Sequence, residues 1–375
     1  MNFWKRFFSN RLAGAGLIYV AFISVIALLG YGITPYKTPF ANQQFVELSA
    51  LPPGSSVDFL AIPRRKHTSE KSTWLHTLLF GRKNDCLFIP IRSFYVKDTL
   101  LNIEPLGIVP PAYRRPLTPT LLGIEGKIDS TAFASLVRST YIVQKRFWLG
   151  TDRLGRDVLS RLIIGARVSL SVGLVAVLIS LLIGVLLGAI AGYFRGNVDK
   201  VIMWLVNVTW SIPTLLLVLS LTLVINKGIL QVFIAIGLTM WVDVARMVRG
   251  QILSLREKEF IEAGRALGYS DARILFRHLL PFTLAPLIVV STSNFASAIL
   301  IESGLSFLGL GVQPPMPSWG SMVKEHYGYL LLGKAYLPLV PGLAIALLTI
   351  AFIYIGSGLR DAFDIKVTTA DSASA

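Results

Sequence analysis

The chain has 375 residues, of which 53% are hydrophobic and only 15% are charged, and its formal net charge is +15. Soluble proteins keep roughly a quarter of their residues charged, so this composition excludes an ordinary soluble domain and indicates a membrane protein. The single cysteine, Cys86, excludes an internal disulfide framework, and the four histidines are too scattered to predict a metal site. Without a compact basic, aromatic-rich module we expect no nucleic-acid partner, because cytoplasmic loops and anionic lipid account for the positive charge.

Six stretches are long and apolar enough to cross a bilayer, which takes about 20 residues. The first follows Lys5, Arg6 and Arg11 as a signal peptide would, but its long apolar run and the lack of a convincing cleavage site predict an uncleaved anchor. The fourth is short and contains Asp243. The predicted fold class is an all-α membrane protein with six transmembrane helices and a large extracytoplasmic insertion after the first. The expected spans are 13–33, 168–193, 201–225, 228–244, 282–301 and 335–359.

Lysine and arginine in short loops predict the orientation, because they favour the cytoplasmic side. They gather on one side of the spans: in the tail 1–12, at Arg195 and Lys200, throughout 246–277, and at Arg360 and Lys366. The short loops of the other side hold only Lys227, Lys324 and Lys334. We therefore expect both termini, the loop 246–281 and the C-tail 360–375 in the cytoplasm. The tail ends in TTADSASA, a small and polar run that predicts disorder.

The segment 34–146 is then extracytoplasmic, and its many bases do not oppose this, since long loops cross the membrane largely regardless of charge. It is rich in proline, as in LPPGSS and IVPPAYRRPLTPT, and its short apolar run CLFIPIRSFYV resembles a strand. We expect a partly ordered domain of mixed α/β character. The next segment, 147–167, places Val158, Leu159, Leu162 and Ile163 on one helical face, opposite several arginines. It predicts an amphipathic helix on the outer membrane surface, capped by Thr151 or Asp152.

The cytoplasmic stretch EAGRALGYSDARILFRHLLP, residues 262–281, has the pattern of two short amphipathic helices. Phe260, Ala263, Gly264 and Leu267 recur at helical spacing and define the face of the first helix. Such a face lies on lipid or on the protein's own inner surface, or it docks into a groove of a soluble subunit, and the pattern alone leaves both open.

The boundaries of these two helices follow from local chemistry. Gly268 accepts the left-handed conformation that ends a helix, and Ser270 is suited to cap the second helix with Asp271 in its first turn. Pro281 fits the first turn of the following span.

Two acidic residues lie at or near membrane depth and are therefore functional candidates. For Asp243 we predict an ion pair with Arg246 or Arg249, and for Glu302 a local capping and pairing role, with a contact to the amino end of a cargo as the alternative. Gly184, Gly188 and Gly192 recur at every fourth position of the second span, which predicts close helix packing. The sequence holds no phosphate-binding loop and no nucleophile motif, so we expect no catalytic residue, metal or cofactor in this chain.

The stretch 262–281 resembles the EAA loop of binding-protein-dependent ABC importer permeases. Glu262, Ala263, Gly268, Leu280 and Pro281 match that pattern, while Gly264 stands in place of its second alanine and His278 in place of an isoleucine. Histidine at this position is usual in the peptide-importing branch. FWLGTDRLGRDVLSRLIIGARVSL, residues 147–170, and ESGLSFLGLGVQPPMPSWGSM, residues 302–322, resemble two further blocks of the oligopeptide and dipeptide (peptide/nickel) branch. The resemblance runs from residue 147 to the end of the sixth span and points to the C-type subunit.

This resemblance implies a permease core of the type I importer kind over 168–359, in the bacterial inner membrane. It implies four kinds of partner: a second permease subunit, two ATPase subunits that hydrolyse ATP in place of this chain, an extracytoplasmic binding protein, and membrane lipid. The expected cargo is a di- or oligopeptide, with nickel chelates or glutathione-like peptides as the alternative, and a non-transporting receptor or scaffold as a more remote one. It assigns ATPase coupling to Glu262, Ala263, Gly264, Gly268, Ser270, Asp271, Leu280 and Pro281, and an outer gate or binding-protein contact to Glu302, Pro314, Pro315 and Trp319.

Overall fold

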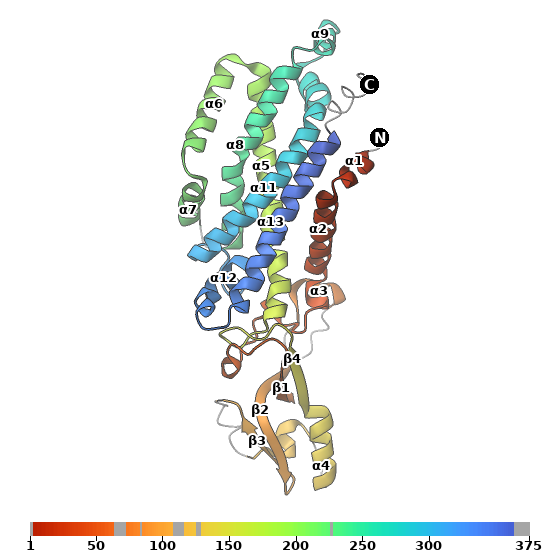
Figure 1. Ribbon diagram of the computed structural model, residues 1–375, viewed down its shortest axis with the longest axis vertical. Helices are drawn as coiled ribbons and strands as arrows, with labels where there is room; N and C mark the ends of the chain where they lie inside the picture. Colours follow the sequence, from red (N-terminus) through yellow and green to blue (C-terminus); the bar gives the residue numbers. More distant parts are fainter. Residues whose placement is uncertain are drawn as a thin grey trace, which may run out of the picture.

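The computed structural model describes residues 3–63, 73–82, 85–107, 116–124, 129–225 and 228–363. Figure 1 shows an elongated molecule, with a bundle of long helices and a small sheet beyond one end of it; both termini lie toward the other end. Several sequence predictions fall outside the described residues, namely most of the C-tail with its TTADSASA run, residues 108–115 of the proline-rich segment, Lys227 and Lys366.

Within the described residues, five helices are long and apolar enough to cross a membrane. They comprise α2 (Arg11–Leu29), α5 (Val158–Phe194), α8 (Ile229–Leu255), α11 (Leu280–Leu308) and α13 (Tyr336–Phe363). A bent pair, α6 (Gly196–Ser211) and α7 (Thr214–Val224), would make a sixth if it is counted as one span. The chain is thus a mostly helical membrane protein with five or six spans.

The third expected span, 201–225, is not one straight helix, because α6 and α7 meet at 95°. Pro213 lies between them and has no backbone N–H to give to a helix. The ring of Pro213 also disfavours helical geometry at Ile212, whose φ of −89° and ψ of 128° are extended. Helix α6 therefore ends at Ser211, and α7 begins at Thr214.

Two other expected boundaries were wrong, since helices continue through them. The predicted surface helix within 147–167 is not separate: its apolar face belongs to the first turns of α5, which continues to Phe194 without a proline. Asp157 caps α5 by accepting a 2.8 Å hydrogen bond from the Ser160 N–H, so neither Thr151 nor Asp152 is the cap. Likewise, α8 runs to Leu255, so residues 246–255 extend the fourth span and are not a loop.

The segment between α2 and α5 folds around a four-stranded antiparallel sheet of order β3-β2-β1-β4. Its strands are β1 (Ser55–Pro63), β2 (Cys86–Lys97), β3 (Leu100–Pro105) and β4 (Ile142–Phe147), and Leu60 of β1 pairs with Ile89 and Ile142. Phe133 of α4 (Ser130–Leu136) shares their apolar core with Leu60 and Ile89. The expectation of a mixed α/β unit with a strand at CLFIPIRSFYV is confirmed, and the all-α description holds for the membrane bundle alone.

The remaining helices are short. They are α1 (Phe3–Ser9), α3 (Trp74–Phe80), α9 (Glu259–Ala266), α10 (Asp271–Arg273) and α12 (Trp319–His326), the π-helical segments Val137–Tyr141 and Ile274–Leu279, and the 3₁₀ turns Gly30–Gly32, Pro39–Ala41, Val46–Leu48, Pro119–Leu122 and Tyr327–Leu330.

The backbones of α5 and α8 approach each other along Gly184, Gly188 and Gly192, which we call the glycine seam. A Cβ added at Gly184 would lie 2.5 Å from the Val244 Cβ, and one at Gly188 would lie 2.5 Å from the Ala245 carbonyl oxygen. Both distances are far below a van der Waals contact, so only glycine fits while the helices keep this spacing. The predicted close-packing role of these glycines is confirmed.

We predict opposite effects for two alanine substitutions that bear on this helix pair. Gly188→Ala places a methyl group against backbone that cannot rotate away, and we expect it to destabilise the protein by about 1–3 kcal/mol. Gly250→Ala in α8 has open space around its Cβ, and we expect it to stabilise the helix by up to about 1 kcal/mol. Thermal unfolding in mild detergent measures both. A Gly188→Ala protein that unfolds at or above the wild-type temperature would contradict the glycine seam.

Candidate functional site

The stretch 259–281 lies at the end of the bundle near both termini (Figure 1). Its first helix, α9, ends at Ala266 with Leu267 as the C-cap, and Gly268 follows with a φ of +74°. The Ser270 hydroxyl accepts a 3.4 Å hydrogen bond from the Arg273 N–H and so caps the next helix. The predicted boundaries at Gly268 and Ser270 therefore hold.

The second short helix is not separate from the span that follows it. α10, the π-helical segment Ile274–Leu279 and α11 form one continuous helix, Asp271–Leu308. Pro281 lies in the first turn of α11 as expected, where a missing N–H does little harm. A movement of α10 is therefore transmitted directly into a long helix of the bundle.

Buried apolar residues attach this stretch to the bundle. Ile261 of α9, with Ile274, Leu275 and Leu279 of the following helix, joins one core cluster with residues of α5 and α8. The Tyr193 hydroxyl at the end of α5 also donates a 2.5 Å hydrogen bond to the Asp271 carboxylate. The stretch thus contacts α5, α8 and α11 at once.

The predicted helical face of α9 lies mostly outward. Gly264 is buried, but Phe260 and Leu267 expose 42% and 71% of their surface, and Ala263 is exposed as well. We call Phe260, Ala263 and Leu267 the α9 outer face. Phe282 at the start of α11 extends it, since its ring centroid lies 5.6 Å from that of Phe260. An exposed apolar surface of this kind needs either lipid or a partner.

The two departures from the EAA pattern meet at one side chain, Tyr269. A Cβ at Gly264 would lie 3.3 Å from the Tyr269 ring, so a second alanine would crowd it. The second departure is His278, whose ring stacks on the Tyr269 ring with the two centroids 5.5 Å apart. The Arg273 guanidinium lies 4.1 Å from the centre of the same ring. The Tyr269 ring therefore accounts for both departures. It leaves little room for an alanine in place of Gly264, and it stacks on His278.

Glu262 is exposed in the first turn of α9, where its charge suits the helix dipole. Its carboxylate forms no ion pair with any residue that the structure describes. The nearby ion pair joins Arg195 and Glu257 instead, at 2.6 Å. Leu280 is partly buried, so the eight expected coupling residues are gathered in one region but differ in exposure.

At the opposite end of the bundle, four buried or half-buried charges form what we call the outer ion cluster: Asp152, Arg156, Arg161 and Glu325. One Asp152 carboxylate oxygen accepts from Arg156 at 2.6 Å and from Arg161 at 2.5 Å. Glu325 of α12 accepts from Arg161 at 2.9 Å and also pairs with Arg156. The cluster ties the loop before α5, and α5 itself, to α12.

Ionisation in this cluster is set by its arginines. Burial by itself would raise the pKa of Asp152, but Arg161 and Arg156 outweigh it and hold that pKa below its ordinary value. The same balance lowers the pKa of Glu325. Burial lowers the pKa of His326, whose Nδ1 lies 2.6 Å from the Met322 carbonyl oxygen. The carboxylates are thus charged and paired at neutral pH.

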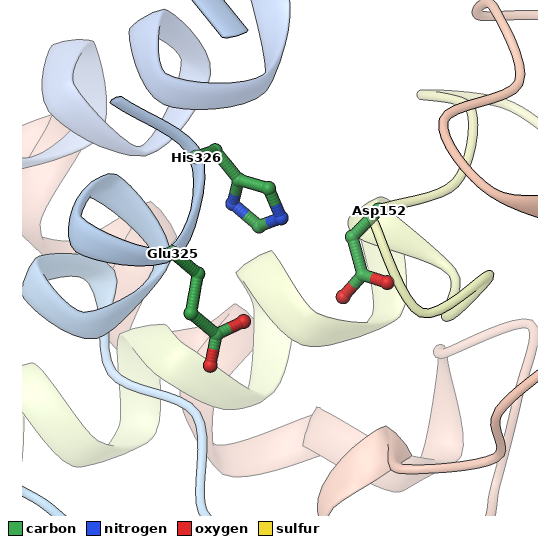
Figure 2. Close-up of side chains that lie close together, drawn as sticks. All are labelled: Asp152, Glu325 and His326. Carbon is green, nitrogen blue, oxygen red and sulfur yellow. The ribbon is translucent and has the colours of Figure 1, made fainter. Parts of the chain in front are cut away.

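Figure 2 shows that Asp152, Glu325 and His326 face one another, and single ligand atoms from the three lie within 4.8 Å. These are residue types that bind divalent metals. Two guanidinium groups, however, already pair with both carboxylates. A divalent cation would have to displace them or lie beside two positive charges, so this arrangement suits an ion-pair network better than a metal centre.

The four residues expected at an outer gate differ in their surroundings. Trp319 is buried, and its indole N–H donates to the Leu162 carbonyl at 2.9 Å, which anchors α12 on α5. Glu302 is fully buried and accepts a 2.7 Å hydrogen bond from the Ser306 hydroxyl. Both side chains are buried in this structure, the bond from Ser306 to Glu302 is a local contact of the kind predicted, and the expected role at an outer gate or binding-protein contact stays a prediction. Pro314 and Pro315 are exposed.

The predicted ion pair of Asp243 with Arg246 or Arg249 is wrong. Arg249 instead binds Asp199 of α6 through both carboxylate oxygens, at 2.5 and 2.6 Å. Arg246 donates to Asn207 at 2.9 Å and lies 4.1 Å from the centre of the Trp210 ring. All three partners lie in α6, which packs beside α8 only in the folded protein, so closeness in sequence did not predict the pairing.

Asp243 lines a cavity of about 350 Å³ between α6, α7, α8 and α11. The polar residues on its walls are Thr209, Thr214, Thr239, Asp243, Asn294 and Ser297. Asn294 is 5% exposed, and its amide nitrogen has no hydrogen-bond partner among the described residues. Apart from the intramembrane acid itself, no sequence pattern predicts this site, because its walls come from four separate helices.

Residues 184–369 match the family described as the binding-protein-dependent transport system inner membrane component. Residues 1–53 match the N-terminal transmembrane domain of oligopeptide transport permease C. The chain is 42% identical over 220 residues to glutathione transport system permease proteins GsiD of Escherichia coli O157:H7 and Shigella sonnei. Each of these alignments covers 59% of this chain and 72% of the relative.

Among solved structures, an inward-facing MetNI methionine ABC transporter is similar in structure. The superposition covers 54% of this chain and 95% of the matched chain. Its sequence identity to this chain is 19% and its TM-score is 0.45.

The outer ion cluster predicts a large stability loss for Asp152→Asn. The exchange keeps the side-chain shape but leaves two arginines facing one carboxylate, and breaking a buried pair costs about 3–5 kcal/mol. Because the pKa of Asp152 is lowered in the folded protein, its contribution is present above the unfolded value, about 4, and is lost as the pH falls through the folded value. Thermal unfolding at pH 7 should show the loss, and the two proteins should converge in acid.

Asp98→Asn is the matched control, since Asp98 is exposed between β2 and β3 and in none of the ion pairs of the described residues. An Asp152→Asn protein as stable as Asp98→Asn at pH 7 would show that the cluster contributes nothing.

Proposed function

Because the chain belongs to the binding-protein-dependent ABC importer permeases, in their oligopeptide and dipeptide branch, we propose that it forms half of a peptide translocation path. It does so with a second, related permease subunit. Its membership in this family supports the proposal of two further kinds of partner, which are ATPase subunits and an extracytoplasmic substrate-binding protein. The chain itself carries out a change of conformation and no bond chemistry.

In this proposal both termini and α9 face the cytoplasm of a bacterial cell. The distribution of lysine and arginine in the short loops supports this orientation. The N-tail 1–12, the span 13–33, the segment 34–146 outside, the core 168–359 and the C-tail 360–375 then have the places that the sequence predicts. The sheet lies on the extracytoplasmic side.

The single observation that carries the coupling proposal is the α9 outer face, an exposed apolar surface beside a helix that continues into the bundle. A soluble ATPase would receive this face in a groove, as amphipathic helices are commonly bound. Movement of α9 would pass through its buried side to α8, and through Gly268 and α10 to α11. Both of these helices line the cavity that contains Asp243. ATP-driven closure of the ATPases would thereby change the exposure of the path.

Two kinds of cargo remain within this proposal. A di- or oligopeptide is the first candidate, on the strength of the branch to which the chain belongs. Glutathione is the second, because the GsiD relatives carry that cargo in their names. Uptake of labelled peptides and of glutathione by the reconstituted complex separates these two from each other and from nickel chelates.

We predict that Leu267→Asp removes the ATPase subunits from the complex. The side chain is 71% exposed, so the substitution should leave folding unchanged while placing a charge in the apolar contact. We expect roughly tenfold less ATPase to co-purify with the tagged chain in mild detergent, the size of an interface hot spot. Leu331→Asp is the control, since Leu331 is 93% exposed but follows α12 at the other end of the bundle. Equal ATPase capture by both variants would argue against docking at α9.

We also predict that Gly268→Pro separates ATP hydrolysis from transport. Proline fixes φ near −65°, whereas Gly268 has a φ of +74°, so the corner between α9 and α10 must change shape. We expect ATPase subunits to remain bound but uptake to fall to about a tenth or less, because the altered corner misdirects α11.

Gly268→Asn is the control for this corner. Asparagine tolerates the left-handed conformation, and no atom lies within 4 Å of the added Cβ. Normal uptake by Gly268→Pro in reconstituted vesicles would remove the corner from the coupling mechanism.

A further inference from the structure

The cavity between α6, α7, α8 and α11 contains a carboxylate without a counter-ion. Asp243 lies near the middle of α8, and both nearby arginines are engaged elsewhere, Arg249 with Asp199 and Arg246 with Asn207 and Trp210. Asp243 itself has no hydrogen bond or ion pair to any described residue. A charge left uncompensated at the middle of a membrane helix is costly unless it faces water or binds a cation.

The surroundings of Asp243 support a ligand rather than lipid. Asn294, near the middle of α11, lines the same cavity, is almost fully buried and has an amide nitrogen without a partner. Hydroxyl groups of Thr209, Thr214 and Ser297 complete a polar wall. Buried amides without partners are rare in folded proteins and call for an explanation. Lipid tails offer no hydrogen bonds, so this wall fits an aqueous path that holds a polar solute.

The cavity also has the size and composition of a small-molecule site. Its volume of about 350 Å³ lies within the range of ligand pockets. Trp210, Leu217, Leu300 and Ile301 add apolar surface beside the polar groups. The Asp243 carboxylate matches a positively charged ligand end, and the Asn294 amide N–H, a donor, matches a neighbouring acceptor such as a peptide carbonyl oxygen.

We propose that Asp243 binds the ammonium group of the cargo during its passage, while the Asn294 amide N–H donates to a neighbouring carbonyl oxygen of the same cargo. This inference rests on the proposed function and adds to it the chemical class of the cargo, a peptide with a free amino end. Asp243 is then a specificity residue inside the path. The ammonium supplies the positive charge that the protein lacks at this site. A charge-assisted hydrogen bond of this kind is among the stronger ones available in a protein.

The test uses the complete complex in vesicles, with its binding protein, and measures ATP-dependent uptake of tri-alanine and of glutathione. For each cargo that the wild type imports, we expect Asp243→Asn to raise KM by about tenfold or more, the loss of one charge-assisted hydrogen bond. The rise in KM should appear only with cargo that carries a free ammonium group, a dependence that a merely structural role would not produce. Asp243→Glu should restore KM to within about threefold, because it restores the charge.

Two controls separate the possible failures. Asp98→Asn removes one exposed negative charge outside the bundle and should leave KM unchanged. N-acetylated forms of the same peptides lack the ammonium, so any uptake of them should be equal in wild type and Asp243→Asn.

An unchanged KM in Asp243→Asn would overturn the inference while leaving the proposed function intact, and so would an equal loss of uptake for free and acetylated peptides. A wild-type complex that imports neither tri-alanine nor glutathione with ATP would overturn the peptide function and this inference together.

Discussion

The close approach of α5 and α8 along the glycine seam is the constraint on which the rest of the bundle depends. With no side chain at three successive turns of α5, the two backbones pack directly against each other. This contact fixes the position of α8, which presents Asp243 to the cavity and contributes Ile252 to the core cluster that also holds Ile261 of α9. A wider spacing would alter the cavity and the attachment of the stretch 259–281 at the same time.

α5 also connects the two ends of the molecule. It has 37 residues and is therefore about 55 Å long. Arg161 in its first turns joins the outer ion cluster, and Tyr193 at its other end holds Asp271. The outer ion cluster binds α12 and the loop before α5, so that end of the bundle is tied to the same helix that contacts the stretch 259–281 at the other end. A rigid element with fixed contacts at both ends is suited to be the frame against which α11 moves.

This division gives a physical picture of coupling. α5 and α8 are locked by backbone contact, whereas α10 and α11 form one continuous helix that includes a π-helical segment, a feature that often marks functional sites. The stretch 259–281 contacts both parts. Force applied to α9 would therefore shift α11 relative to α5 and α8, and the cavity lies between α8 and α11. That shift would change the side of the membrane to which the polar residues lining the cavity are open.

The sequence by itself determined the membrane class, most of the apolar helices, the glycine seam, the strand at β2 and the corner at Gly268 and Ser270. These features depend on composition, helical periodicity and the conformational preferences of single residues, all of which are local. Only the tertiary structure decided which charges meet. Asp243 stands three residues from Arg246, yet Arg246 and Arg249 bind α6, and Arg161 pairs with Glu325, which lies 164 positions away in α12. Ion pairs and cavities arise from residues that packing brings together from distant helices, and spacing along the chain carries no information about that packing.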